Sequence, residues 1–252
     1  MHPFTQRIGT DHSRAWHCGP AIVEDVPGLQ AASWPAQSLR GINTFGIHLA
    51  ATEAGRESAS TLVNRLYGQR GYGQSHQVVA DPHRLTLAAS GLGRMLGTVT
   101  LGRDAPTGLL ADEVFKQEID AYRQSGARVC EVTKLGVDPG AHSQMALASL
   151  FHIVYLYAHK VFQCTDVFIE VNPRHRRFYQ SMLGFSDEAD VRVNPRVNAP
   201  AHLLRISLEY MEAQIERLGG TGMPVGRERS LYPYFFSATE ARRIMQRLMT
   251  LN

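Results

Sequence analysis

The chain has 252 residues, of which 44% are hydrophobic and 19% charged, and its formal net charge is +3 at pH 7. This composition is typical of an ordinary globular protein, and the basic residues form no runs of the kind that bind nucleic acid. The three cysteines, Cys18, Cys130 and Cys164, include no CxxC pair, so neither a disulfide framework nor a zinc site is indicated and a reducing cytoplasm is expected. No signal peptide is apparent, and the longest apolar run is too short to span a bilayer.

The N-terminal extension, residues 1–42, mixes Pro, Gly, His, Ser and Trp without periodicity, and we expect it to be partly ordered at best. One domain with a C-terminal helical appendage is expected over 43–252. It begins with a predicted strand over 45–51 and a helix that Thr52 caps. The next predicted elements are, in chain order, a hairpin of strands 84–90 and 95–101, a helix from Asp112, a strand over 128–137, a helix from Ser143 to about 162, a strand over 166–171, a helix from Pro173 to Gly184, strands near 186–193 and 202–210, and a helix over 241–251 that follows a capping box at Ser237–Glu240.

This order of elements predicts an α/β (α+β) fold in which helices cover both faces of a mixed sheet. Its central strand carries Glu131, a carboxylate that is costly to bury unless it is paired or hydrated. Alternation places Glu131 and Thr133 on one face with Leu135 and Val137, whereas Lys134 faces the other way or lies beside a bulge. Periodicity alone is equally compatible with a Glu131 that works in a cleft and with one that pairs with a neighbouring arginine.

The helix over 173–184 carries Tyr179, which taken singly is best explained as a core aromatic residue. Together with residues 131–137 and the long apolar helix between them, this segment resembles the second half of a GNAT-type acyltransferase. It is most similar to the long-chain N-acyl amino acid synthases, which are relatives of the acyl-homoserine-lactone synthases. The resemblance includes the late segment 231–236 and covers about residues 45–250. It implies a GNAT-like, mostly antiparallel sheet and an N-acyltransferase.

The resemblance also implies roles for particular residues. Glu131 would take the proton of the attacking amine, directly or through one water, and Tyr179 would protonate the leaving thiolate. Backbone N–H groups near Leu135 and Val137 would hold the oxyanion. The residues that match substrate-binding positions of the lactone synthases are Arg65, Asp81, Thr133 and Lys134, of which Lys134 or Arg65 would bind the carboxylate of an amino acid.

Two departures from the related synthases concern the substrates. The Gly-x-x-Arg-Leu pattern of the lactone synthases falls on residues 97–101, where Thr100 replaces the arginine, so an amine other than the lactone precursor is expected. Residues 139–146 lack the glycine loop with which acetyl-CoA-dependent members hold the pyrophosphate. We therefore expect acyl carrier protein, with its phosphopantetheine arm, as the donor, acyl-CoA as the alternative, and neither a permanently bound cofactor nor a metal.

The fatty acyl donor would need a basic docking surface and an apolar tunnel. Arg174, Arg176 and Arg177 would suit an acidic carrier protein, although each is also typical of a solvated helix face. The candidate tunnel residues, each of which taken singly is better explained as ordinary core, are Phe115, Leu147, Phe151 and Tyr155. The rival interpretations are an acyl-homoserine-lactone synthase and a non-catalytic acyl-binding module.

Overall fold

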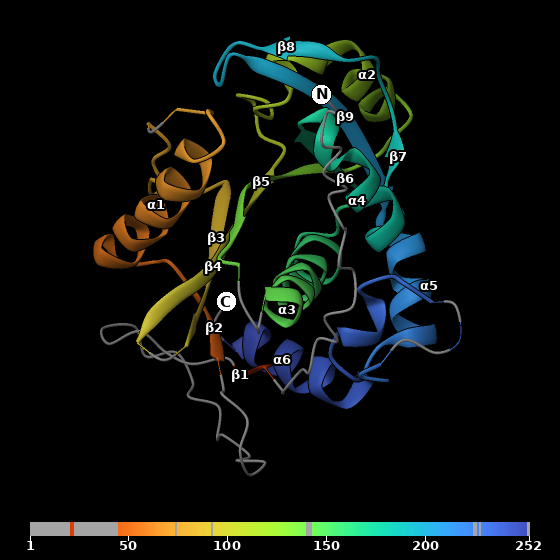
Figure 1. Cartoon of the computed structure of the whole chain (residues 1–252). Helices are drawn as coiled ribbons and strands as arrows, with labels where there is room; N and C mark the ends of the chain where they lie inside the picture. Colours follow the sequence, from red (N-terminus) through yellow and green to blue (C-terminus); the bar gives the residue numbers. More distant parts are fainter. Residues whose placement is uncertain are drawn as a thin grey trace, which may run out of the picture.

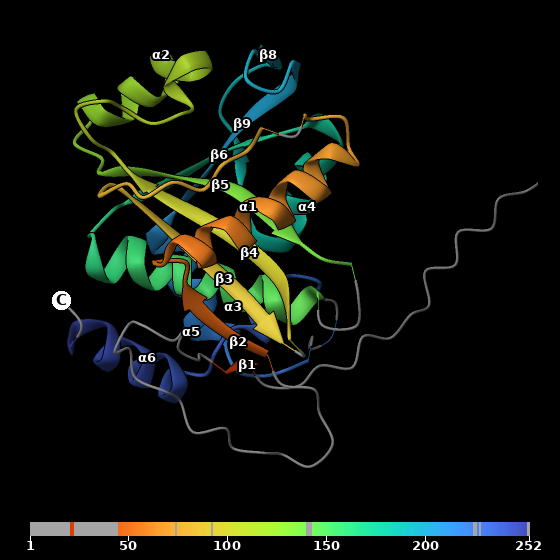
Figure 2. The same ribbon diagram turned by 90° about the vertical axis from the view of Figure 1, so that its left-hand side faces the viewer.

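The computed structural model describes residues 21–22, 45–73, 75–91, 93–139, 143–223, 226 and 228–250 (Figure 1 and Figure 2). Its elements are, in chain order, β1 (Ala21–Ile22), β2 (Phe45–Leu49), α1 (Glu53–Gly68), β3 (Arg84–Gly91), β4 (Arg94–Arg103), α2 (Asp112–Gln124), β5 (Val129–Val137), α3 (Ser143–Tyr155), the π-helix η1 (Leu156–Val161), β6 (Asp166–Val171), α4 (Pro173–Leu183), β7 (Ser186–Asp187), β8 (Arg192–Asn194), β9 (Ala199–Ser207), α5 (Leu208–Leu218), the 3-10 turn η2 (Tyr232–Tyr234) and α6 (Ala238–Thr250).

The strands are hydrogen-bonded in the order β1-β2-β3-β4-β5-β6-β9-β7, and β8 pairs with β9 beside this path. The pairs β1–β2 and β5–β6 are parallel, whereas the other strand pairs are antiparallel. Figure 1 shows α1 on one side of β3, β4 and β5, and α3 on the other. The expected α/β (α+β) fold, with a mixed and mostly antiparallel sheet between helices, is confirmed.

The two faces of the sheet carry separate apolar cores. The larger core packs α3 residues such as Leu150 against strand residues such as Val132 and Ile169. The smaller core lies on the other face and joins Phe115 of α2 to Phe168 of β6. These cores fix α2 and α3 on opposite faces of β5 and β6.

A bulge in β5 changes the direction of its side chains. Thr133 pairs with Thr100 and Gly136 with Thr98, so two residues of β5 stand opposite the single residue Val99. Lys134, one of those two residues, has a positive φ of 50°, which is the geometry of a bulged strand. As a result Leu135 and Val137 pack against the larger core. The prediction that they share a face with Glu131 and Thr133 is wrong, and the predicted alternative of a bulge at Lys134 is confirmed.

The parallel strands β5 and β6 separate after four residue pairs. Their pairing runs from Val129 and Asp166 to Val132 and Ile169. Beyond that point β5 continues beside β4, whereas β6 continues beside β9 as far as the pair of Val171 and His202. The separation leaves the middle of the sheet open between the second half of β5 and the end of β6.

Helix capping explains most of the predicted boundaries. Thr52 caps α1 by accepting the N–H of Gly55 at 3.1 Å, and Ser237 and Glu240 form the predicted capping box before α6. The strand expected near 202–210 is too long, because Ser207 caps α5 by accepting the N–H of Tyr210 at 3.1 Å.

Parts of the sequence predictions fall outside the described residues. The extension over 1–42 is described only at Ala21–Ile22, so its boundary and the appended domain layout stay predictions. Residues 140–142, in the segment that lacks the glycine loop, are also outside the described part. Among the helices that are described, none has both the length and the apolar character needed to cross a membrane.

Candidate active site

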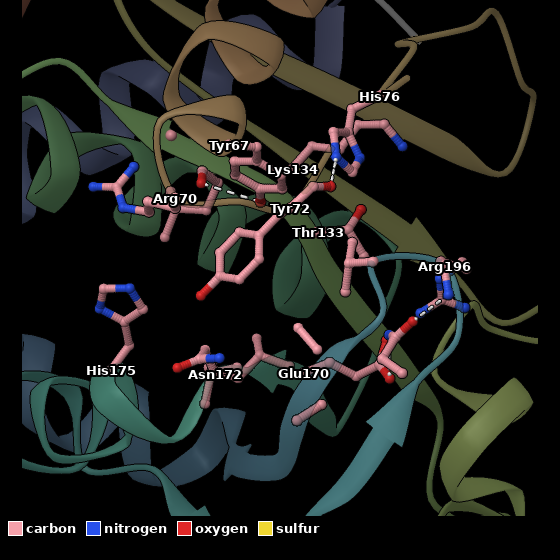
Figure 3. A pocket seen from close by; sticks show the side chains of 18 of the residues that line it. Tyr67, Arg70, Tyr72, His76, Thr133, Lys134, Glu170, Asn172, His175 and Arg196 are labelled. Carbon is pink, nitrogen blue, oxygen red and sulfur yellow. Dashed lines mark hydrogen bonds and ion pairs between the residues drawn. The ribbon is translucent and has the colours of Figure 1, made fainter. Parts of the chain in front are cut away.

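A cavity of about 950 Å³ opens where β5 and β6 separate (Figure 3). Its walls come from the end of α1 and the loop after it, from the second half of β5, from the end of β6, from the start of α4, from one residue of α3 and from the segment between β8 and β9. Because the cavity follows the separation of two strands, backbone and side chains from both faces of the sheet reach it.

Glu131 lies in one wall of this cavity with only 1% of its surface exposed. Its Oε1 accepts the N–H of Leu110 at 2.9 Å, and its Oε2 accepts the N–H of Ala111 at 3.1 Å. Nη1 of Arg84 lies 3.2 Å from Oε1, and Nε of Arg84 lies 3.3 Å from Asp81. The arginine pairing considered from the sequence is therefore present, while the role of Glu131 as proton acceptor stays a prediction.

Glu170, a second carboxylate, stands at the end of β6 just beyond the last pair with β5. Its side chain is 12% exposed. Oε1 accepts the amide of Asn194 at 3.0 Å, and Oε2 pairs with Nη2 of Arg196 (Figure 3). Burial raises the pKa of Glu170 to about 7, although the charge of Arg196 opposes this shift. Glu170 is therefore a carboxylate that changes its charge near neutral pH.

Thr133 and Lys134 line the cavity beside these carboxylates. Oγ1 of Thr133 is buried and has no hydrogen-bond partner among the described residues. The ammonium of Lys134 forms no ion pair with a described carboxylate, and burial followed by the charge of Arg84 lowers its pKa. The Thr133 hydroxyl lacks a hydrogen-bond partner and the Lys134 ammonium lacks an ion-pair partner among the described residues, and a ligand with hydrogen-bond acceptors would supply both.

Two of the tyrosines that line the cavity, Tyr67 and Tyr179, have hydroxyls whose pKa is raised by burial. The hydroxyl of Tyr67 donates to the carbonyl of Leu135 at 3.3 Å, and burial raises its pKa to about 12. Burial, and then Tyr67, also raise the pKa of Tyr179. The ring of Tyr179 packs edge-on against Phe151, with 6.4 Å between ring centroids. A neutral phenol of this kind is suited to donate a proton.

The end of the cavity near α4 is basic. Figure 3 shows Arg70 and His175 there, at the opposite end from Glu170. Arg174 donates from Nη2 to the hydroxyl of Tyr72 at 2.7 Å, and its Nε lies 3.2 Å from Nε2 of His175. Burial, followed by Arg174 and Arg70, lowers the pKa of His175. Neither arginine pairs with a carboxylate in the part of the chain that is described, so this end presents uncompensated positive charge.

The two predicted substrate-binding residues outside β5 do not line this cavity. Arg65 pairs through Nη1 with Asp138 at 3.0 Å on the solvent side of α1. Asp81 contacts Arg84 and so reaches Glu131 only indirectly. Leu135 and Val137 do line the cavity.

Only one of the predicted tunnel residues lines the cavity, and one of the predicted docking residues is engaged in an ion pair. Leu147 lines the cavity, whereas Phe115 is in the smaller core and Phe151 and Tyr155 are in the larger core. On α4, Arg176 pairs with Asp187 through Nε at 2.6 Å. The remaining predicted docking residues, both exposed on α4, are Arg174 and Arg177.

Glu170, Arg196 and Arg70 line the cavity and are not among the residues predicted from the sequence. Glu170 could have been found from the sequence, because it lies within a predicted strand. Like Glu131, it is a carboxylate that is costly to bury unless it is paired or hydrated. Arg196 and Arg70 carry no such signal in the sequence, since both lie in segments between elements and reach the cavity only through the folding of distant strands.

The comparisons with known proteins agree with this architecture. The profile of the family described as N-acyl amino acid synthase FeeM matches residues 58–207, which is more than half of the 252 residues. Among solved structures, FeeM, an N-acyl amino acid synthase from uncultured soil microbes, superposes with a TM-score of 0.60 at 24% identity, covering 68% of this chain and 95% of that one. The AHL synthase LasI gives a TM-score of 0.49 at 10% identity, covering 66% and 91%. No curated protein matches the chain.

The fold and the family match together define the class of this protein as a GNAT-type N-acyltransferase. The chain belongs to the FeeM family of N-acyl amino acid synthases.

Proposed function

We propose that this protein transfers a long-chain fatty acyl group from a thioester on acyl carrier protein to the amine of an amino acid. The observation that supports this most directly is the cavity at the separation of β5 and β6, which joins a polar end at Glu170 to a basic end at α4. A thioester held at the separation would be open to an amine from the polar end. Cys130 and Cys164 are buried outside the cavity lining, which favours direct attack without an acyl-cysteine intermediate.

The polar end of the cavity is suited to the amino acid. The carboxylate of the acceptor would bind the ammonium of Lys134 and the hydroxyl of Thr133, two groups that have no such partner among the described residues. A bound carboxylate would also offset the burial and the charge of Arg84 that lower the pKa of Lys134. Arg65, the other carboxylate-binding candidate, is engaged with Asp138.

Acyl transfer would proceed on the bulged part of β5. The N–H of Asp138 already donates to the carbonyl of Leu96 at 2.7 Å, so the oxyanion would be held by N–H groups between Leu135 and Val137. Tyr179 would protonate the departing thiolate, since the raised pKa of its hydroxyl keeps the proton available at neutral pH. The amine must also lose a proton, and the carboxylates that line the cavity are Glu131 and Glu170.

The basic end of the cavity is suited to the donor. The phosphopantetheine arm carries a phosphate, and Arg70, Arg174 and His175 would meet that phosphate where the arm enters. The acidic carrier protein would rest on the exposed arginines of α4. Leu147 and Phe178 would contact the start of the acyl chain. We place the reaction in the cytoplasm, where the free cysteines stay reduced.

The decisive experiment combines the purified protein with long-chain acyl carrier protein and a mixture of amino acids, followed by mass spectrometry of the lipid products. We expect a long-chain N-acyl amino acid. A lactone product would favour the lactone synthase, and the absence of any new lipid with both acyl carrier protein and acyl-CoA as donors would contradict the proposed function.

A further inference from the structure

The proposed reaction requires a group that takes a proton from the acceptor ammonium, because only the neutral amine is a nucleophile. Glu131 is poorly placed for this task. Both of its oxygens accept backbone N–H groups at the start of α2, Arg84 contacts it as well, and 1% of its surface is exposed. A carboxylate held in this way has both oxygens engaged by its existing partners and little access for a substrate amine.

Glu170 has the access that Glu131 lacks. It follows Ile169, the last residue of β6 that pairs with β5, so its carboxylate stands at the point where the sheet opens. Each of its oxygens has one partner in the structure, Asn194 on Oε1 and Arg196 on Oε2, and a carboxylate oxygen has room for a second. The carboxylate is thus oriented from one side and open to a ligand in the cavity on the other.

The geometry points to Glu170 as the catalytic residue that takes the ammonium proton of the acceptor, with Glu131 as a positioning residue that fixes the start of α2 beside it. This inference rests on the proposed function and names the residue that performs one of its steps. It makes Asn194 and Arg196 the side chains that orient the catalytic carboxylate.

The charges around Glu170 suit a base that works near neutral pH. Arg196 faces it from the segment between β8 and β9, and Arg196 also pairs with Glu113 of α2 at 2.8 Å. From β5, Glu131 adds negative charge, and Lys134 lines the same cavity. Burial raises the pKa of Glu170 to about 7, the Arg196 charge lowers it, and the Glu131 charge raises it. A base is most effective when its pKa lies near the working pH.

The proton balance of the transfer closes with these residues. Glu170 takes one proton from the ammonium, and the freed nitrogen lone pair forms the C–N bond to the thioester carbonyl. The tetrahedral intermediate then collapses, the C–S bond breaks, and sulfur leaves with the bonding electron pair. Tyr179 gives that thiolate a proton and regains one from the nitrogen of the new amide. Glu170 finally releases its proton to solvent, so the products are an amide, a thiol and one proton.

The first test is the pH dependence of kcat/KM for the acceptor in the full chain, followed by release of the donor thiol. The wild-type rate should rise with pH through a midpoint near 7, because Glu170 must be ionised to act. Glu170→Gln should lower kcat/KM by ~10²–10⁴-fold and abolish this rise. Glu113→Gln is the control. Glu113 also pairs with Arg196 but does not line the cavity, so this variant should keep the rise with pH. An intact rise in Glu170→Gln, or a change in KM alone, would overturn the assignment.

Two further variants keep the inference testable if Glu170→Gln does not fold. Arg196→Gln should shift the midpoint to higher pH, because the positive charge that favours ionised Glu170 is removed. Glu131→Gln should keep the rise and shift it to lower pH, because a neighbouring negative charge is lost. Loss of the rise in Glu131→Gln would return the role to Glu131. An unmoved midpoint in Arg196→Gln would contradict a role for Glu170.

A readout without turnover separates this inference from the proposed function. Infrared difference spectra of the wild type against Glu170→Gln should show one carboxyl group that titrates near pH 7. If that titration is seen while no acyl amino acid forms with any donor, the proposed function fails. If acyl transfer occurs while Glu170 titrates as an ordinary carboxyl group, only the assignment of Glu170 fails.

Discussion

Lys134 combines an uncommon backbone conformation with an uncommon electrostatic environment. Its φ of 50° is rarely adopted by a residue with a side chain, and such conformations persist where the surrounding structure imposes them, often at functional sites. Its ammonium is partly desolvated, and burial and the charge of Arg84 lower its pKa, whereas the charge of Glu131 opposes this shift. The bulge therefore holds Lys134 in a strained backbone conformation that brings its ammonium, which forms no ion pair with a described carboxylate, to the cavity.

Replacement of Lys134 should affect acceptors selectively. We expect Lys134→Met to raise the KM for amino acids by about 10- to 100-fold, since a charge-assisted hydrogen bond contributes about 1.5–3 kcal/mol and each 1.4 kcal/mol is about tenfold. The decarboxylated amine of the same amino acid should be used equally well by the variant and the wild type. Steady-state kinetics with this pair of acceptors measures the difference.

Lys116→Met provides the control for Lys134→Met. Lys116 lies on the exposed side of α2, where it pairs with Asp120, and it does not line the cavity, so the same substitution there should leave both acceptors unchanged. Equal losses with the amino acid and with its decarboxylated amine in Lys134→Met would show that Lys134 does not bind the carboxylate.

The residues of the site illustrate the limit of sequence reasoning. Glu131, Thr133 and Tyr179 were found because they lie in segments with a recognisable pattern, and all three line the cavity. Arg196 was not found, because its approach to Glu170 depends on where the turn after β8 falls relative to β6. The role of Glu131 is similarly hidden, since its partners at Leu110 and Ala111 are backbone groups that no side-chain pattern reveals.

At the scale of elements, the sequence predicted positions better than it predicted irregularities. Alternation extended the last strand to Tyr210 because Leu208 and Tyr210 continue its period of two, whereas Ser207 as a helix cap starts α5 instead. Alternation also failed along β5 beyond Thr133, because a single bulged residue reverses the faces of everything after it. In each case a single position breaks the local period, Ser207 at the start of α5 and the bulge at Lys134 in β5.

The connection between α5 and α6 provides a test of close packing. Gly220 has a φ of 78°, donates its N–H to Phe235, and would place a Cβ 2.6 Å from the Cα of Ser237, the cap of α6. Gly222 has a φ of 72°, donates to Pro233, and has nothing within 4 Å of its would-be Cβ. The two glycines therefore differ in packing and share their conformation and bonding.

Alanine at these two positions should separate strain from steric conflict. Gly222→Ala should cost about 1–2 kcal/mol for the left-handed conformation alone. Gly220→Ala should cost about 1–3 kcal/mol more, because the backbone at Ser237 must move. Urea unfolding of both variants measures the free energies, and equal losses would show that the start of α6 yields without cost.

At the scale of the whole molecule, part of the excess positive charge lies near one end of the cavity. Many arginines are neutralised within the fold, as in the pairs of Arg123 with Asp104 and of Arg176 with Asp187. Arg70, Arg174 and Arg177 are exposed and form no ion pair with a described carboxylate. Arg70 lines one end of the cavity, and Arg174 contacts Tyr72 and His175 of that end. An acidic donor would therefore be attracted to the entrance that its acyl chain must use.

This arrangement predicts the donor preference. Long-chain acyl carrier protein should exceed the matching acyl-CoA in kcat/KM, and the advantage should shrink as salt rises, because the Debye length falls from ~10 Å at 0.1 M to ~3 Å at 1 M. Arg177→Gln should reduce the efficiency with the carrier protein more than Arg243→Gln, an equal change of charge on α6. Steady-state kinetics with both donors at two ionic strengths measures this preference, and a higher kcat/KM with acyl-CoA would contradict the predicted preference for acyl carrier protein.

The two backbone hydrogen bonds that Glu131 accepts have a consequence for motion. Amide protons at the start of a helix usually exchange rapidly with solvent, since they have no partner within the helix. Here the amides of Leu110 and Ala111 are held by a buried carboxylate on β5. Their deuterium uptake therefore reports the separation of α2 from the sheet rather than the fraying of α2 itself, and these two amides can exchange no faster than the wall of the cavity beside Glu131 opens.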